Sequence, residues 1–169
     1  FKRVFLNGSV EDNGCAIGAA LSVSNELGQV RKPSKVTDYY GKVYSDREIL
    51  SSLKKFDLAF KKLSKNELYS ETARLLCSGS ILGWFQGRSE FGPRALGNRS
   101  ILADPYNVET KFMLDQFMKS RDRYRPYAPI VLEEDAQKYF DITGSSPVMM
   151  RNVKVLSNNL ASVTHVDNT

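Results

Sequence analysis

Apolar residues recur at helical spacing in several segments of the chain. Residues 15–27 combine small and apolar side chains and end at a glycine, which predicts a helix. Residues 46–56 and 65–78 repeat an apolar helical spacing. Each of these two segments follows a serine that has a glutamate three positions later, the capping-box pattern that satisfies free N–H groups at a helix start. We therefore expect two helices that begin after Ser45 and Ser64.

Helices and strands alternate along the rest of the chain. Residues 108–119 place four large apolar side chains on a helical period, which predicts a helix: Phe112, Met113, Phe117 and Met118. Residues 133–140 read as a short helix. Short apolar runs typical of buried strands lie at residues 81–85 and 127–132. Residues 2–6 read as a short strand, and residues 148–156 are strand-like. This alternation predicts an α/β domain from about residue 45 onward.

A polar segment separates the first helix from the later elements. Residues 28–45 are broken by Pro33 and have the composition of a linker between two domains. We assign residues 1–40 to the end of one domain with its linker, and residues 41–169 to a second, truncated domain. The chain begins without methionine on a strand-like run and ends without a closing element, so we expect a piece of a longer protein.

Composition indicates an ordinary folded protein, with 41% apolar and 25% charged residues among 169. No apolar run approaches the roughly 18 to 20 residues that cross a bilayer, and the N-terminus lacks a secretion signal, so we expect a cytoplasmic location without membrane partners. Cys15 and Cys77 are far apart, which favours two buried structural thiols over a disulfide or a zinc site. His165 is the only histidine, so we expect no metal centre built by this chain alone.

The densest candidate chemistry lies in residues 87–100, GRSEFGPRALGNRS, directly after a predicted strand. Open α/β sheets bind ligands at such positions. Glycines let the backbone approach a ligand, and arginine offers a planar fork of donors to phosphate or carboxylate, so the segment predicts an oxyanion cradle. It is not the GxxxxGK[ST] phosphate loop, because no Lys-Ser or Lys-Thr follows the glycines. The alternative is an exposed loop whose arginines pair with Glu90 and Asp104.

A second basic cluster, KSRDRYR, spans residues 119–125 after a predicted helix. In an extended exit from the helix, Lys119 and Arg121 would point the same way and could hold one phosphate. The alternative is that these cations only complement the negative end of the helix dipole. The net charge of +5 is moderate, and its placement among Gly, Pro and Asn favours a concave site for a small anion over a long basic face.

The long motifs GWFQGRSEFGPRALGNRSILADP and KSRDRYRPYAPIVLEEDAQKYF resemble the carbamoyltransferases related to nodulation and antibiotic-tailoring enzymes. FLNGSVEDNGCAIGAA resembles the end of that family's actin-like N-terminal domain. The resemblance implies an α/β fold: a YrdC-like twisted mixed sheet with flanking helices, plus a short strand-helix remnant of the actin-like domain. It also implies that the C-terminal domain binds carbamoyl phosphate and ATP and makes carbamoyl adenylate, from which the N-terminal domain carbamoylates a substrate hydroxyl.

The resemblance also assigns residues. It matches the catalytic basic residues of the family to Arg94, Lys119 and Arg125. Nearby candidates for binding substrate or nucleotide are Arg88, Asn98, Arg99, Ser100 and Arg121. The N-terminal nucleotide turn matches Asp12, Asn13 and Gly14.

The implied small molecules are ATP, Mg²⁺ and carbamoyl phosphate, with any iron expected only in the missing N-terminal domain. The implied partner is a small hydroxyl acceptor bound by that domain, and a homodimer is compatible with the sequence. Because the family continues beyond Thr169, we expect an incomplete site and a fragment that is inactive alone.

Two other functions remain open from the sequence. A YrdC-like enzyme could instead make threonylcarbamoyl adenylate for tRNA modification, although the GRSEFGPRALGNRS string favours O-carbamoyl transfer. A basic RNA-binding module would need aromatic platforms among its cations, for which Phe91, Tyr124 and Tyr127 are available. Net charge alone is weak support for that reading, so we expect no nucleic-acid partner.

Overall fold

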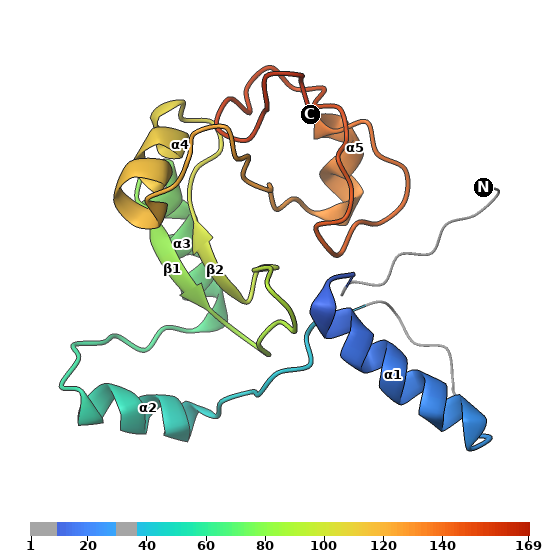
Figure 1. Cartoon of the computed structure of the whole chain (residues 1–169). Helices are drawn as coiled ribbons and strands as arrows, with labels where there is room; N and C mark the ends of the chain where they lie inside the picture. The colour runs from blue at the N-terminus through green and yellow to red at the C-terminus, as the bar shows by residue number, and fades with distance from the viewer. Residues whose placement is uncertain (1–9, 30–36) are drawn as a thin grey trace.

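The computed structural model describes residues 10–29 and 37–169. Within these ranges the chain forms five α-helices, a π-helical turn, a 3-10 turn and one sheet of two antiparallel strands (Figure 1). The mixed α and β composition agrees with the sequence prediction. The larger twisted mixed sheet does not form in the described residues, and the predicted strand at residues 2–6 lies outside them.

The first helix, α1, spans Asp12–Glu26 and confirms the prediction for this segment. Leu27 is its C-cap, and Gly28 follows with φ of 70°, a left-handed conformation that glycine adopts without a steric penalty. None of the α1 residues is buried. Figure 1 shows α1 projecting from the rest of the chain with its first turn toward the other elements.

Both predicted capping boxes are present. Helix α2 spans Asp46–Lys55 and α3 spans Lys65–Cys77, and each begins at the expected serine. In both helices the serine side chain accepts from the backbone of the glutamate three residues on, while that glutamate side chain accepts from the serine backbone. The pair satisfies two free N–H groups at each helix start, which explains why the boundaries follow from sequence alone.

The strand β1, Leu82–Phe85, pairs in antiparallel register with β2, Arg99–Leu102, and Phe85 lies opposite Arg99. The prediction of a strand was right, but that of a buried one was wrong. Alternate residues of β1 face solvent, and Phe85 is 55% exposed. A strand paired on one side only, in a two-stranded sheet, has no second layer to cover its outer face.

Helix α4, Glu109–Met113, continues directly into the π-helical turn η1, Leu114–Lys119. The helix was predicted, but the sequence did not show which of its residues are buried. The four large apolar residues at positions 112, 113, 117 and 118 are 39 to 69% exposed. The residues that are buried are Thr110, Leu114 and Asp115, so the interior here is organised around a carboxylate.

The two remaining strand predictions were wrong. Residues 127–132 are irregular, and Ile130 and Leu132 are 70% and 64% exposed. Residues 148–156 form one isolated bridge, between Phe140 and Val155, instead of a strand. The short helix predicted between these segments is present as the 3-10 turn η2, Glu133–Asp135, followed by α5, Ala136–Tyr139.

The chain has an open arrangement. Its accessible surface is 13220 Å², whereas a compact monomer of this mass would expose about 8400 Å². Among the described residues, the buried apolar side chains are those of Leu114, Phe140 and Leu160. Both cysteines, predicted to be buried, are exposed free thiols, because Cys15 and Cys77 lie on helices that cover no core.

Candidate functional site

The predicted anion loop, residues 87–100, comprises most of the connection between β1 and β2 together with the first two residues of β2. It is closed at its base by the hydrogen bond of 2.9 Å from the Gln86 N–H to the Asn98 carbonyl. The loop also packs on residues 38–41, where the Gly41 N–H donates to the Ser89 carbonyl at 3.0 Å. A Cβ atom on Gly41 would lie 2.9 Å from that carbonyl oxygen, so only glycine permits this close approach.

Glu90 lies at the centre of the loop. Its Oε1 atom accepts hydrogen bonds from the backbone N–H groups of Leu96, Asn98 and Arg99 at 2.8, 2.8 and 3.1 Å. Burial alone would raise the pKa of Glu90, but these backbone hydrogen bonds outweigh burial and hold the pKa below its usual range. The loop is thus a cradle of converging N–H groups, as expected for an oxyanion site, but the anion in it is the side chain of Glu90.

Two arginines of the loop bind backbone carbonyl groups. Arg99 donates to the carbonyls of Gln86, Asn98 and Gly87 at 2.8 to 3.1 Å. Its guanidinium also lies 3.5 Å from the ring centroid of Phe85, a cation–π contact. Arg88 donates to the carbonyl of Gly41 at 3.1 Å. These two cations have a structural role, because they tie the loop to residue 41 and to its own first residues.

The predicted polar ligands Asn98 and Ser100 are also engaged within the loop. The amide of Asn98 donates to the carbonyl of Arg88 at 2.8 Å, and the hydroxyl of Ser100 accepts from the N–H of Gly97 at 3.0 Å. The alternative of arginines paired with Glu90 and Asp104 does not hold among the described residues. Glu90 accepts from the backbone, and Asp104 accepts from the N–H of Tyr106.

The second basic cluster is organised by Asp115, which is 1% exposed. Its carboxylate accepts from Lys111 Nζ at 2.8 Å, from the Tyr127 hydroxyl at 2.9 Å and from Arg121 Nε at 3.3 Å. Burial raises the pKa of Asp115, but the hydrogen bonds from these three donors more than offset burial, and the pKa lies below its ordinary value. A buried charge therefore has two cationic partners and one neutral donor.

The Arg121 side chain makes several contacts within this cluster. Besides its contact with Asp115, it donates to the carbonyl of Pro126 at 3.1 Å, and its guanidinium lies 3.9 Å from the ring centroid of Tyr127. The predicted extended exit from the helix does not occur, because Ser120 is left-handed, with φ of 46°. Lys119 and Arg121 are therefore not joined by an extended strand, and Arg121 turns back to the buried carboxylate.

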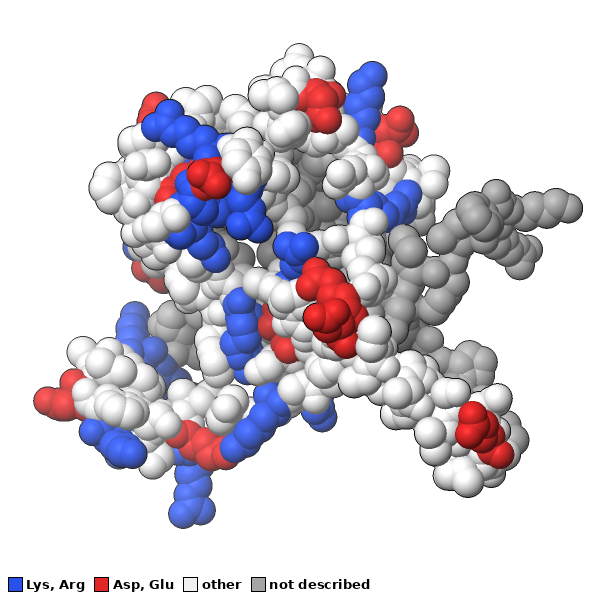
Figure 2. All heavy atoms as spheres, in the orientation of Figure 1, with Lys and Arg blue, Asp and Glu red and all other residues white. Residues whose placement is uncertain are grey.

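Three predicted cations remain. The side chains of Lys119 and Arg125 have no hydrogen bond or ion pair to any residue in the ranges 10–29 and 37–169. Arg94 has one such contact there, with Glu11 at 3.4 Å, and both side chains are half exposed. Figure 2 shows basic side chains gathered on one face around the α4 end of the molecule. Of the predicted cations, Lys119 and Arg125 are thus the least engaged, and Arg94, like Arg88, has a single contact.

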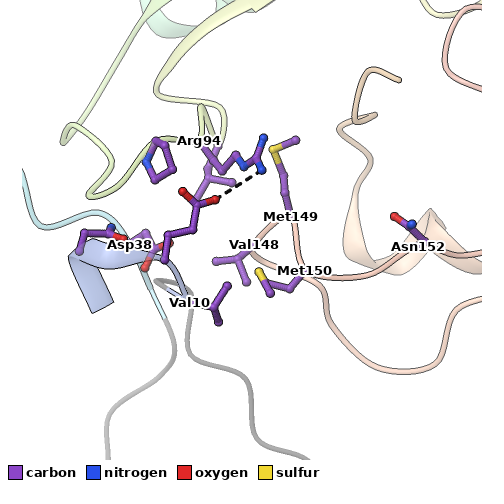
Figure 3. Close-up of a pocket in the computed structure, with 11 residues that line it drawn as sticks. Val10, Asp38, Arg94, Val148, Met149, Met150 and Asn152 are labelled. Atoms are coloured by element: carbon purple, nitrogen blue, oxygen red, sulfur yellow. Dashed lines mark hydrogen bonds and ion pairs between the residues drawn. The ribbon is translucent and has the colours of Figure 1, made fainter. Parts of the chain in front are cut away.

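Arg94 lines a cavity of about 340 Å³. Figure 3 shows its guanidinium beside the segment 148–150, with the contact to the Glu11 carboxylate dashed. The wall is apolar on the side of Val148, Met149 and Met150. Polar groups of the lining include Asn13 and Asn152. The cavity thus joins a cation of the predicted anion loop to the predicted N-terminal turn, although neither Lys119 nor Arg125 lines it.

The N-terminal turn lies at the start of α1. The Gly14 N–H donates to the Glu11 carbonyl at 2.8 Å, and Asp12 is the acidic residue of the first helical turn. The side-chain amide atoms of Asn13 are buried and have no hydrogen-bond partner among the residues that the structure describes. Of the predicted trio, Asn13 is the residue that reaches the cavity lining.

Sequence reasoning missed Glu90 as the occupant of the cradle and Asp115 as the centre of the second cluster. The signal for Asp115 was its position four residues after Lys111, the spacing at which helical side chains of opposite charge meet. Two aromatic residues proposed for RNA stacking are packed instead: Phe91 lies edge-on to Tyr40, and Tyr127 holds Asp115. Tyr124 is 73% exposed.

Comparison with known proteins shows the family. Residues 73–169 match the sequence profile described as carbamoyltransferase C-terminus. This range contains both basic segments and the Glu90 and Asp115 networks. The chain therefore belongs to the carbamoyltransferase family, as its C-terminal part.

Relatives of this chain extend across its whole length. It is 42% identical to the nodulation protein NolNO of Sinorhizobium fredii, with all of this chain and 26% of that protein covered. It is 40% identical to the nodulation protein NolO of Bradyrhizobium diazoefficiens, over all of this chain and 32% of the relative. It is 34% identical to 3'-hydroxymethylcephem-O-carbamoyltransferase of Amycolatopsis lactamdurans, over 99% of this chain and 31% of that enzyme. The chain spans about a quarter to a third of these curated relatives.

Residues 10–29 and 37–169 contain no cluster of three or more His, Cys, Asp or Glu side chains placed to hold a metal ion. In the same ranges, every helix is too short or too polar to span a bilayer.

Proposed function

We propose that this chain is the part of an O-carbamoyltransferase that binds carbamoyl phosphate, with the phosphate held by Arg94, Lys119 and Arg125. The observation that carries the proposal is that the fold engages some cations of the two basic segments and leaves others with few or no contacts. Arg99 and Arg121 each make several contacts with carbonyl groups, an aromatic ring or Asp115, whereas Lys119 and Arg125 make none with the described residues and Arg94 makes one half-exposed ion pair. A phosphate dianion is the natural partner of such cations, because charge-assisted hydrogen bonds to it are short and strong.

The finer parts of the proposal rest on the resemblance. They are a YrdC-like domain, an ATP-dependent activation to carbamoyl adenylate, and transfer to a small hydroxyl acceptor by an actin-like domain. Asp12, Asn13 and Gly14 would belong to the second domain. Since the described residues hold no cluster fit for a metal, Mg²⁺ would arrive on the phosphates of ATP and not on this chain. A cytoplasmic location is part of the same proposal.

The role proposed for these residues is to bind and orient carbamoyl phosphate. A carbamoyl phosphate whose phosphate is fixed by three cations has its developing negative charge stabilised by groups that are already in place. No nucleophile of the protein is required for this role. The sequence has one histidine, His165, and its ring pairs with Asp167 at 3.0 Å, away from any serine or cysteine nucleophile in the described contacts.

The test is carbamoyl-phosphate-dependent release of pyrophosphate from ATP by the complete protein. Arg94→Ala or Lys119→Ala should lower the rate about a hundredfold or more, by analogy with the loss of an oxyanion donor. Matched controls are Arg47→Ala and Lys65→Ala, which remove exposed cations from the helices α2 and α3. Normal turnover by the Arg94 and Lys119 variants would make the basic cluster a solvated surface and refute the proposal.

A further inference from the structure

The loop of residues 119–127 carries two of the three proposed phosphate ligands, yet neither ligand side chain is held by a contact of its own. Lys119 ends the π-helical turn, and Arg125 lies in an exposed turn six residues later. A pair of cations binds one phosphate only if their backbone positions are fixed relative to each other, since ordering two long side chains is entropically costly. Something else in the fold must fix the loop.

Asp115 makes contacts at both ends of this loop. At the start, the backbone carbonyl of Asp115 accepts from the N–H of Arg121 at 3.2 Å. At the far end, its carboxylate accepts from the hydroxyl of Tyr127. The same residue therefore holds the first and the last turn of the loop, one through its main chain and the other through its side chain.

The two cations paired with Asp115 also bind main-chain carbonyl groups of the loop. Lys111 Nζ, 2.8 Å from the carboxylate, also donates to the carbonyl of Arg125 at 2.9 Å. Arg121, bound to the same carboxylate, donates to the carbonyl of Pro126 at 3.1 Å. The main chain at Arg125 is thus tied through one bridging cation to a carboxylate that is 1% exposed. In such a buried position the pairing is far less screened than at the surface.

We propose that Asp115 is a positioning residue for phosphate recognition: by binding Lys111, Arg121 and Tyr127, it holds Lys119 and Arg125 at the separation that one phosphate group requires. This inference rests on the proposed function. It also explains why Lys111 and Arg121, although basic and close by, are not phosphate ligands. Their charges balance the buried carboxylate, and their remaining donors close the loop.

The proposal makes a prediction opposite in sign to simple electrostatics. Removing a carboxylate near a phosphate site should, by charge alone, attract phosphate more strongly. If Asp115 positions the loop, its removal should instead weaken phosphate binding. Asp122 provides a matched control, because it is an exposed acid in the same loop whose replacement changes the net charge by the same amount.

The experiment compares Asp115→Asn and Asp122→Asn in the complete protein. Binding of carbamoyl phosphate and of inorganic phosphate is measured by calorimetry, and KM values are measured for carbamoyl phosphate and for ATP. Asp115→Asn should weaken binding of both anions about tenfold to a hundredfold, the order expected when a ligand is misplaced by about 1 Å, while leaving the KM for ATP near the parent value. Asp122→Asn should bind as tightly as the parent or more tightly.

Tyr127→Phe keeps the ring and removes one hydrogen bond, so it tests the idea even if Asp115→Asn is too unstable to assay. It should weaken anion binding less than Asp115→Asn does and should speed hydrogen exchange at the Arg121 amide. Unchanged or tighter anion binding in both variants would overturn the positioning role. A parent protein that binds neither anion would refute the proposed function instead, and exchange at Arg121 would still report whether Asp115 orders the loop.

Discussion

The Oε1 atom of Glu90 accepts a hydrogen bond of 2.8 Å from the backbone N–H of Asn98. The chain supplies its own carboxylate to a cradle of N–H groups that the sequence suggested for a ligand. This relationship divides the work within the segment 87–100. The backbone and Glu90 shape the loop, whereas Arg94 lines the cavity beside Glu11, where we propose that it binds an external anion.

Replacing Glu90 should loosen the loop. Glu90→Ala leaves the N–H groups of Leu96, Asn98 and Arg99 without their acceptor, and a lost partner of a buried group costs about 1 to 3 kcal/mol. Hydrogen exchange should accelerate at these three amides. Glu109→Gln, at an exposed position on α4, is the control and should leave exchange unchanged. Equal protection in Glu90→Ala and the parent would show that the carboxylate does not order the loop.

Arg99 should matter for stability through its shape as well as its charge. Arg99→Lys keeps the charge but loses the planar fork that reaches the carbonyls of Gln86 and Gly87 and stacks on Phe85. We expect the free energy of unfolding to fall by about 1 to 2 kcal/mol, measured by denaturant titration. Arg47→Lys should be neutral. A lysine variant as stable as the parent would mean that these contacts contribute nothing net.

The contribution of Asp115 should depend on pH in a defined direction. Its pKa is held below the ordinary 3.8, so the folded state binds a proton less readily than the unfolded state. The stability that the carboxylate contributes is therefore fully present above about pH 4 and is lost as the pH falls through the depressed pKa. The stability difference between the parent and Asp115→Asn should be constant near neutral pH and shrink below pH 4. A difference that grows on acidification would contradict this assignment.

The two cysteines should react as exposed thiols. Cys15 lies on α1 and Cys77 ends α3, and neither is covered by other elements. In the 169-residue chain, a thiol reagent should modify both without denaturant, at rates close to those of an unfolded peptide. Added urea should then change the rates little. Slow modification of either thiol that urea accelerates would restore the earlier expectation that the cysteines are core residues.

The sequence predicted those parts of the fold that depend on neighbours along the chain. The helices after Ser45 and Ser64 start where predicted, because a capping box is made within four residues. The strand predictions failed at residues 127–132 and 148–156, because a short apolar run becomes a strand only if a partner strand pairs along it. In the described residues the first segment has no such partner, and the second pairs only at the Phe140–Val155 bridge.

The candidate site shows the same division. Residue type and density identified the basic segments, and family resemblance selected Arg94, Lys119 and Arg125. The sequence could not show that Arg99 and Arg121 would be consumed by the chain's own carbonyl and carboxylate groups. Which cations are bound by groups of the chain itself depends on how the loops fold back, and this can be seen only in the tertiary structure. The same reason hid Asp115, which looks like one acid among many until its burial is known.

The sequence separation of the Asp115 contacts also bears on how early in folding the loop of residues 119–127 can form. Its side-chain partners lie 4, 6 and 12 residues away in the chain, whereas the partner of Arg94, Glu11, lies 83 residues away. Closing a short loop costs less entropy than closing a long one, so local contacts assemble early in folding. Lys119 and Arg125 therefore belong to a locally encoded unit that tolerates changes elsewhere, while Arg94 reaches its final environment only after the N-terminal segment has docked.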